Sequence, residues 1–337
     1  MTEEELSRKV DEIAAKMTNE EKIAFCSGKD FWHTKGFAQY EIPEIMMTDG
    51  PNGLRKQVGK ADALGNESSE EATCFPTAVT AAQTWNRKLL YEEGRAIGEE
   101  AKEAKVAVVL GPGVNIKRSP LCGRNFEYYS EDPYVAGELG ASFVAGMQNE
   151  TGIGASLKHF ACNSQEYRRL QSDSQVDERS LREIYLRAFE KVVKKAQPAT
   201  VMCAYNKING IFCSDNKKLL TDILRKDWGF KGAVVTDWGA LNSRTEAFRA
   251  GCDLAMPGGS ALGEKEAAKA LKDGTLDIEC VNTSVKRLLS LVLRRAEALE
   301  KGKDYSYDRT AHQMTAQRIA EEGAVLLKNE GNILPLD

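Results

Sequence analysis

The stretch KGAVVTDWGA, residues 231–240, runs through a short apolar segment directly into Asp237 and Trp238. Continuous apolar segments of this length are typical of parallel strands that are covered on both faces. Similar segments recur along the chain and end in polar residues or glycine-rich turns: EIMMTDGPNG (44–53), VAVVLGPGVNI (106–116), GASLKHFACN (154–163), ATVMCAYNKING (199–210) and DLAMPGG (253–259). The sequence therefore predicts six parallel strands.

Helical patterns lie between several of these strands. Thr18 and Glu21 have the spacing of a capping box in front of NEEKIAF. Residues 177–198 place apolar side chains on one helical stripe before Pro198, namely Leu181, Ile184, Tyr185, Ala188, Phe189 and Val192. Alternating strands and helices without a Gly/Ser linker predict an α/β fold, a (β/α)8 TIM-like barrel over residues 1–320. Six strands instead of eight leave room for an incomplete or irregular barrel.

In such a barrel the active site lies at the carboxyl ends of the strands, because side chains from different strands converge on that face. Asp237 lies at such an end. An aspartate after a strand is often only the N-cap of the next helix. Here, however, several strands end in acidic, basic or aromatic residues, which favours a functional site.

Composition excludes several other classes of protein. The 337 residues are 42% hydrophobic and 28% charged, and the net charge of −4 is spread along the chain, which argues against nucleic-acid partners. No long apolar segment or basic leader pattern is evident, so we expect no membrane partner and a cytoplasmic location. The eight cysteines form no CxxC pair and the three histidines no metal-ligand spacing. We therefore expect reduced cysteines, no metal and no cofactor.

Five ordered motifs resemble those of glycoside hydrolase family 3, in its β-glucosidase type, over almost the whole chain. The motifs are MTDGPNGLR (47–55), RSPLCGRNFEYYSEDP (118–133), LKHFACNSQE (157–166), VMCAYNKINGIFCS (201–214) and VVTDWGA (234–240). The resemblance implies a TIM-like barrel and a retaining glycosidase of carbohydrate metabolism. It also implies that Asp237, the aspartate of the TDW stretch, is the nucleophile that forms a covalent glycosyl intermediate.

The resemblance further implies a set of residues that bind the nonreducing terminal sugar. Asp49 matches an acid that accepts hydrogen bonds from sugar hydroxyls, Tyr205 a hydroxyl near the nucleophile, and Trp238 an aromatic face for the sugar ring. The remaining matches are to hydrogen-bond donors, namely Arg55, Arg124, Lys158, His159 and Arg169. Read from the sequence alone, Asp49 also suits a turn, Arg55 and Arg169 suit a solvated surface, and Tyr205 and Trp238 suit a core. Lys158 and His159 end an apolar strand, where burial without a function would be costly.

The general acid/base has no evident position in this sequence. In the β-glucosidase type it is a glutamate on a second α/β domain, and residues 321–337 resemble the exit segment toward that domain. The N-acetylglucosaminidase branch keeps a histidine-containing loop within the barrel, from which KHFACNSQE departs. Glu127, Glu166 and Asp173 are present as carboxyls, and Glu166 is the one that could substitute. We expect a following α/β domain, in cis or in trans, and weak or no activity of this chain alone.

Several functions stay open at this stage. The leading expectation is release of terminal β-D-glucose from a β-glucoside or a short β-glucan oligosaccharide. Within the same family, a β-xylosidase or an α-arabinofuranosidase is the nearest alternative. A noncatalytic carbohydrate-binding barrel would use the sugar-binding residues without turnover. An aldolase would use Lys158 as a Schiff-base residue.

Overall fold

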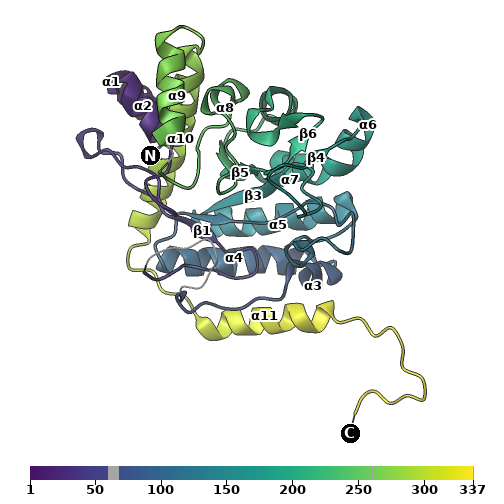
Figure 1. Cartoon of the computed structure of the whole chain (residues 1–337). Helices are drawn as coiled ribbons and strands as arrows, with labels where there is room; N and C mark the ends of the chain where they lie inside the picture. Colours follow the sequence, from purple (N-terminus) through teal and green to yellow (C-terminus); the bar gives the residue numbers. More distant parts are fainter. Residues whose placement is uncertain (60–67, 260, 337) are drawn as a thin grey trace.

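A curled sheet of five parallel strands forms the centre of the molecule (Figure 1). The computed structural model describes residues 1–59, 68–259 and 261–336. In the sheet the order is β1 (Met47–Asp49), β2 (Val108–Leu110), β3 (Gly154–Phe160), β5 (Thr200–Cys203) and β8 (Ala233–Thr236). The order of the strands in the sheet is their order along the chain, and a crossover connection joins each strand to the next. All four neighbouring pairs are parallel, so the carboxyl ends of the strands lie at the same edge.

The ring of strands continues beyond β8 through isolated β-bridges. These bridges pair Val235 with Leu254, Ser27 with Ala255, Gly28 with Thr34, and His33 with Met46, which precedes β1. The first two bridges are parallel and the last two are antiparallel. The predicted TIM-like barrel, incomplete or irregular, is confirmed. The sixth expected strand, 253–259, contributes only bridges, because its neighbour Ser27 lies in an irregular segment.

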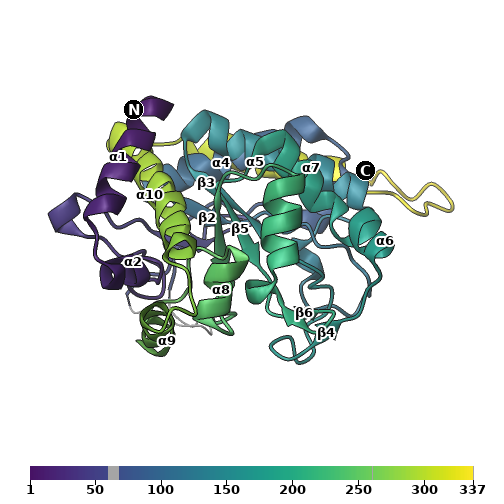
Figure 2. The same cartoon turned by 90° about the horizontal axis from the view of Figure 1, so that it is seen from above.

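Helices surround the sheet, with α1 and α10 on one side and α6 and α7 on the other (Figure 2). Their bounds are α1 (Glu3–Lys16), α2 (Asn19–Phe25), α3 (Ala78–Gln83), α4 (Arg87–Glu103), α5 (Pro133–Thr151), α6 (Glu178–Ser180), α7 (Arg187–Ala196), α8 (Arg244–Ala250), α9 (Ala261–Lys272), α10 (Ile278–Lys301) and α11 (Arg309–Gly323). Single 3-10 turns are η1 (Ala38–Tyr40), η2 (Asn125–Glu127) and η4 (Cys213–Asp215), and π-helical segments are η3 (Leu181–Tyr185) and η5 (Lys218–Asp227). A separate small sheet contains β4 (Asp173–Ser174), β6 (Lys207–Ile208) and β7 (Ile211–Phe212).

Burial on both faces explains the unbroken apolar runs of the strands. Val201 and Val234 belong to a buried cluster with residues of α4, α5 and α7. Met202 and Val235, their neighbours in sequence, belong to a second cluster with residues of α1, α2 and α10. Because side chains alternate along a strand, burial on both faces favours apolar residues at consecutive positions.

Helix ends follow the expected local signals. Thr18 accepts a hydrogen bond from the Glu21 backbone N–H, and the Glu21 side chain accepts one from the Thr18 N–H, which confirms the capping box. The last helix, α11, lies along α3 and α4 (Figure 1) and residues 324–336 follow it without regular structure. The division of the chain at residue 320 stays a prediction, and Asp337, the end of the expected exit segment, lies outside the described residues. Among the described residues, none of the helices combines the length and apolar character needed to cross a lipid bilayer.

Candidate active site

A cavity of about 240 Å³ opens at the carboxyl ends of the strands. Side chains from the ends of all five strands, β1, β2, β3, β5 and β8, line it, together with residues of the connecting loops. All nine residues singled out in the sequence lie around this one cavity, namely Asp49, Arg55, Arg124, Lys158, His159, Arg169, Tyr205, Asp237 and Trp238. Motifs up to 190 residues apart are therefore brought together by the ring of strands.

Asp237 lies at the base of this cavity and is only 6% exposed. Its Oδ1 accepts a hydrogen bond of 2.7 Å from the Trp238 backbone N–H. Its Oδ2 lies 3.5 Å from His159 Nε2 and 3.6 Å from Arg124 Nη1. Helix α8 is capped by Ser243, so Asp237 is not the N-cap of the next helix.

Three polar atoms therefore converge with unused hydrogen-bonding capacity. Within the part of the chain that the structure describes, Asp237 Oδ2, His159 Nε2 and Arg124 Nη1 are buried and make no hydrogen bond. Buried polar atoms without a partner are rare because they cost about 1–3 kcal/mol each. Three such atoms around one point suit a ligand that carries both donors and acceptors, such as a sugar.

A second carboxylate balances the charge beneath the cavity. Glu127 accepts from Arg124 Nε at 2.5 Å and pairs with Lys158 Nζ at 3.1 Å, and its side chain is 4% exposed. Burial alone would raise the pKa of Glu127, but Lys158 and Arg124 hold that pKa below its ordinary value. Burial also raises the pKa of Asp237, and here Arg124 and Lys158 offset the effect only in part. The pKa of His159 lies well below its ordinary value because of burial and the nearby Arg124 and Lys158.

The mouth of the cavity is more exposed. Asp49 Oδ2 lies 3.5 Å from Arg55 Nη1, and about two fifths of each side chain is exposed, at 36% and 42%. The Arg169 guanidinium lies over the Tyr205 ring, 4.3 Å from the ring centre, and Tyr205 donates a hydrogen bond to the Trp238 carbonyl. These side chains offer hydrogen-bond donors and acceptors to the outer part of a ligand.

An aromatic wall was missed by reasoning from the sequence. Phe31 and Trp32 line the cavity beside Trp238, and the Trp32 and Trp238 rings are 5.5 Å apart. The Trp238 indole N–H donates to the Phe31 carbonyl at 2.7 Å, which fixes the orientation of the indole. Leu110 and Met202 complete the apolar lining. The one signal in the sequence is a pair of adjacent aromatic residues within the polar loop SGKDFWHTKG, residues 27–36.

No glutamate is found among the described residues that line the cavity. Glu166 instead pairs with Arg169 at 2.9 Å and accepts from Asn163. Asp173 accepts from the Gly210 backbone and from Gln175. The described residues also contain no group of three His, Cys, Asp or Glu side chains that could hold a metal ion.

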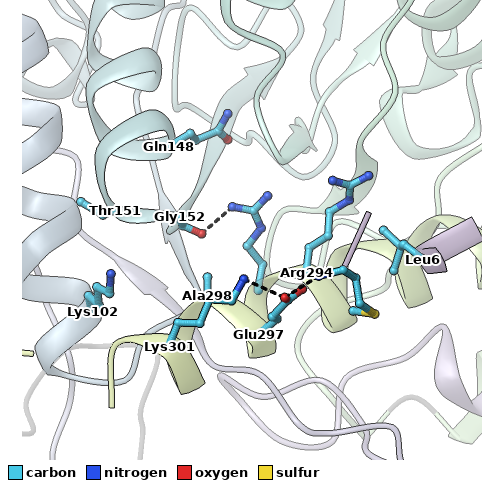
Figure 3. Close-up of a pocket in the computed structure, with 11 residues that line it drawn as sticks. Leu6, Lys102, Gln148, Thr151, Gly152, Arg294, Glu297, Ala298 and Lys301 are labelled. Carbon is cyan, nitrogen blue, oxygen red and sulfur yellow. Dashed lines mark hydrogen bonds and ion pairs between the residues drawn. The ribbon is translucent and has the colours of Figure 1, made fainter. Parts of the chain in front are cut away.

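A larger cavity of about 360 Å³ is lined by residues of α4, α5 and α10 (Figure 3). Its lining includes Gly152, which precedes β3, so this cavity lies at the opposite end of the strands. Its charged groups are engaged with protein partners. Arg295 donates to the Gly152 carbonyl at 2.6 Å, Lys301 pairs with Glu297 at 2.8 Å, and Arg294 pairs with Glu3. The contacts of Arg295 and Arg294 connect α10 to the end of α5 and to α1, so we regard this cavity as a structural junction.

Comparison with known proteins matches most of this chain to one family. The family described as "Glycosyl hydrolase family 3 N terminal domain" matches residues 41–291. Thermostable beta-glucosidase B of Acetivibrio thermocellus is 50% identical over 97% of this chain and 43% of that protein. Exo-alpha-(1->6)-L-arabinopyranosidase of Bifidobacterium longum is 45% identical over 95% of this chain and 42% of that protein.

Solved structures agree with this comparison. The Bifidobacterium adolescentis GH3 beta-glucosidase superimposes with a TM-score of 0.89 at 45% identity, covering 96% of this chain and 46% of that one. Beta-glucosidase 3B of Thermotoga neapolitana, in complex with alpha-D-glucose, gives a TM-score of 0.90 at 41% identity, covering 98% and 48%. The chain thus spans less than half the length of the relatives that it matches.

Proposed function

The chain belongs to glycosyl hydrolase family 3, and from this premise we propose that it is the nucleophile-bearing barrel of a retaining exo-acting β-glucosidase. The observation that carries the proposal is the position of Asp237. Its free Oδ2 faces a cavity at the carboxyl ends of the strands, between His159 and Arg124. Several relatives and solved neighbours are named as β-glucosidases, and these names support the proposed activity.

In the proposed reaction, Asp237 Oδ2 attacks the anomeric carbon of the terminal sugar. The bond to the leaving oxygen breaks, that oxygen takes a proton from a general acid, and a glycosyl ester of Asp237 forms. Water then hydrolyses the ester with retention of configuration. Arg124 and Lys158 serve this step because their charges favour the ionised form of Asp237 against the effect of burial.

The remaining lining residues bind the sugar. Lys158, His159, Arg124, Arg55 and Arg169 donate to hydroxyls, Asp49 accepts from hydroxyls, and Trp238 covers an apolar face of the ring. Pockets for drug-sized ligands occupy ~300–1,000 Å³, and this cavity is smaller at about 240 Å³. It suits one terminal sugar of a β-glucoside or short β-glucan, as exo action requires.

The general acid/base is assigned to a following α/β domain, in cis or in trans. A retaining glycosidase needs a second carboxyl roughly 5 Å from the first. Asp49 is the other carboxyl among the described lining residues, and Arg55 pairs with it. The length of the relatives, more than twice that of this chain, leaves room for such a domain.

A second candidate sugar is α-L-arabinopyranose. The relative from Bifidobacterium longum is named for that activity, and at 45% identity it is as similar to this chain as the solved Bifidobacterium adolescentis β-glucosidase is. β-Xylosidase and α-arabinofuranosidase activities stay within the same proposal as alternatives. A Schiff-base role of Lys158 is disfavoured, because the ion pair with Glu127 stabilises the ammonium form, which is not nucleophilic.

A panel of 2,4-dinitrophenyl glycosides tests this function, because so acidic a leaving group needs little protonation. We expect the chain to hydrolyse the β-D-glucoside faster than the α-L-arabinopyranoside and the β-D-xyloside. Asp237→Ala should lower the rate by about 10⁴-fold or more, with an unchanged melting temperature. Faster hydrolysis of another glycoside would show that β-D-glucose is not the preferred sugar. Activity that survives in Asp237→Ala would refute the nucleophile, and binding without turnover would indicate a noncatalytic barrel.

A further inference from the structure

A buried tyrosine lies directly behind the imidazole of the candidate site. The Tyr128 hydroxyl is 2.9 Å from His159 Nδ1, and both side chains are fully buried. On its other side the same hydroxyl lies 3.4 Å from the Asn163 side-chain amide nitrogen and 3.4 Å from the Asn163 carbonyl. Tyr128 follows η2 and does not line the cavity, so it can reach a ligand only through His159.

The two nitrogens of His159 face very different partners. Nδ1 faces the Tyr128 hydroxyl, and Nε2 faces Asp237 Oδ2 at 3.5 Å. His159 is neutral, because burial and the positive charges of Arg124, Lys158 and Arg169 all disfavour the imidazolium. A neutral imidazole carries a single N–H, so one nitrogen donates and the other accepts.

One arrangement of protons turns a donor of His159 toward the carboxylate of Asp237. The Asn163 amide donates to the Tyr128 oxygen, the Tyr128 hydroxyl donates to Nδ1, and Nε2–H points toward Asp237. In the opposite tautomer, the lone pair of Nε2 would face the lone pairs of a carboxylate oxygen. The Tyr128 hydroxyl lies 2.9 Å from Nδ1 and 3.4 Å from the Asn163 carbonyl, so its contact with the imidazole is the shorter of the two.

We propose that Tyr128 is a positioning residue that holds His159 as the Nε2–H tautomer, so that the imidazole donates toward Asp237 and the bound sugar. The importance of this contact for catalysis rests on the proposed function, whereas the tautomer itself does not. Tyr128 acts through His159 in the way that outer partners set the tautomer of a metal-bound or catalytic histidine.

The small number of histidines makes the proposal directly measurable. The chain has three, His33, His159 and His312, so ¹⁵N-histidine labelling gives three imidazole spin systems. His33 is partly exposed and is assigned with His33→Gln, while His312 lies between two carboxylates and carries two protons. We expect the ¹⁵N shifts of His159 to report a neutral Nε2–H tautomer at pH 7.5, because the pKa of this buried imidazole lies well below its ordinary value.

Tyr128→Phe should add the Nδ1–H tautomer to the His159 spectrum and slow hydrolysis of the dinitrophenyl glycoside roughly tenfold. Tyr129→Phe is the matched control, because it removes the hydroxyl of the next buried tyrosine, which packs in the core cluster. That control should change neither measurement. An Nδ1–H tautomer in the unmodified chain, or an unchanged tautomer in Tyr128→Phe, would overturn the proposal.

The two readouts separate this inference from the proposed function. If the chain has no glycosidase activity while His159 is the Nε2–H tautomer, only the function is wrong. If activity is present while His159 is the Nδ1–H tautomer, only the role of Tyr128 is wrong. Should Tyr128→Phe fail to fold, the spectrum of the unmodified chain still decides between the two tautomers.

Discussion

At Asp237, burial and charge act on the carboxyl in opposite directions. Burial raises its pKa, and the cations Arg124 and Lys158 lower it. A nucleophile must be ionised, yet an ion held too strongly by its neighbours would attack slowly. The candidate site therefore places two cations near Asp237 and pairs both with Glu127, which limits the positive charge that Asp237 experiences.

Arg124→Gln should shift the acidic limb of the pH–rate profile to higher pH. The substitution removes a positive charge that lies 3.6 Å from Asp237 Oδ2, so the pKa of Asp237 rises further. We expect a shift of about one pH unit or more, measured with the dinitrophenyl glycoside. Arg118→Gln, an exposed arginine of the preceding loop, is the control and should leave the limb in place. If the acidic limb of the pH–rate profile is unchanged in Arg124→Gln, or moves to lower pH, this account of the site is contradicted.

The residues of the site were predictable to the extent that they follow regular strands. Lys158, His159 and Asp237 end apolar runs, and family-like motifs surround them. The structure brings them together around one cavity with the other six predicted residues. Phe31 and Trp32 could not be predicted in the same way. Their loop reaches the cavity through isolated bridges, which leave no periodic pattern in the sequence.

At the scale of elements, the segment 177–198 shows where pattern reasoning fails. The helical stripe predicted there is largely buried, yet Ile184 is 41% exposed. The cause is η3, a π-helical segment that adds a residue to one turn and rotates Ile184 away from the core. Apolar periodicity assumes a constant 3.6 residues per turn, so it cannot locate such an insertion.

A buried ion cluster joins helix α11 to helix α4. His312 of α11 lies between two carboxylates of α4, with Nδ1 at 2.8 Å from Glu100 and Nε2 at 2.9 Å from Glu99. Burial alone would lower the pKa of His312, but Glu100 and Glu99 outweigh burial and raise it to about 9. Both nitrogens donate, so the ring is an imidazolium that holds α11 against α4.

His312→Leu should destabilise the chain by about 3 kcal/mol at pH 6, because it leaves two carboxylates near an apolar side chain. The folded pKa of His312 is raised above its ordinary value of 6.5. Its contribution is therefore fully present below about pH 6.5 and is lost as the pH rises through about 9. Urea unfolding at pH 6, 7.5 and 9.5 should show the two proteins converging. The control, His33→Leu, changes an exposed histidine and should matter little. A difference that is constant across this pH range would refute the imidazolium.

At the scale of the whole molecule, the proposed reaction needs two carboxyls, and Asp237 is the one that we place in the barrel. The barrel fold was predictable because strands and helices alternate along the sequence. The sequence showed six apolar segments instead of eight, which predicted an irregular barrel but not where its irregular part lies. The position of the acid/base was not predictable from the sequence, and Glu166, the carboxyl that could substitute for it, does not line the cavity among the described residues. Glu166 pairs instead with Arg169, three residues further along the chain.

This chain should therefore hydrolyse cellobiose far more slowly than dinitrophenyl β-glucoside. Loss of positioned general acid catalysis costs about 10²- to 10⁴-fold, and a sugar leaving group depends on it most. Supplying the following α/β domain of a relative in trans should raise the cellobiose rate and leave the dinitrophenyl rate almost unchanged. Glu166→Gln should alter neither rate. Rapid cellobiose hydrolysis by the chain alone, abolished in Glu166→Gln, would place the acid/base in the barrel.

The identity of the carboxylate that forms the glycosyl ester tests the central claim most directly. The chain is incubated with 2,4-dinitrophenyl 2-deoxy-2-fluoro-β-D-glucoside, whose leaving group departs without a general acid and whose fluorine slows hydrolysis of the ester. Peptide mass spectrometry should then find one fluoroglucosyl group, on the peptide that contains Asp237, and none in Asp237→Ala. A label on Asp49, Glu127 or any other carboxylate would contradict the account.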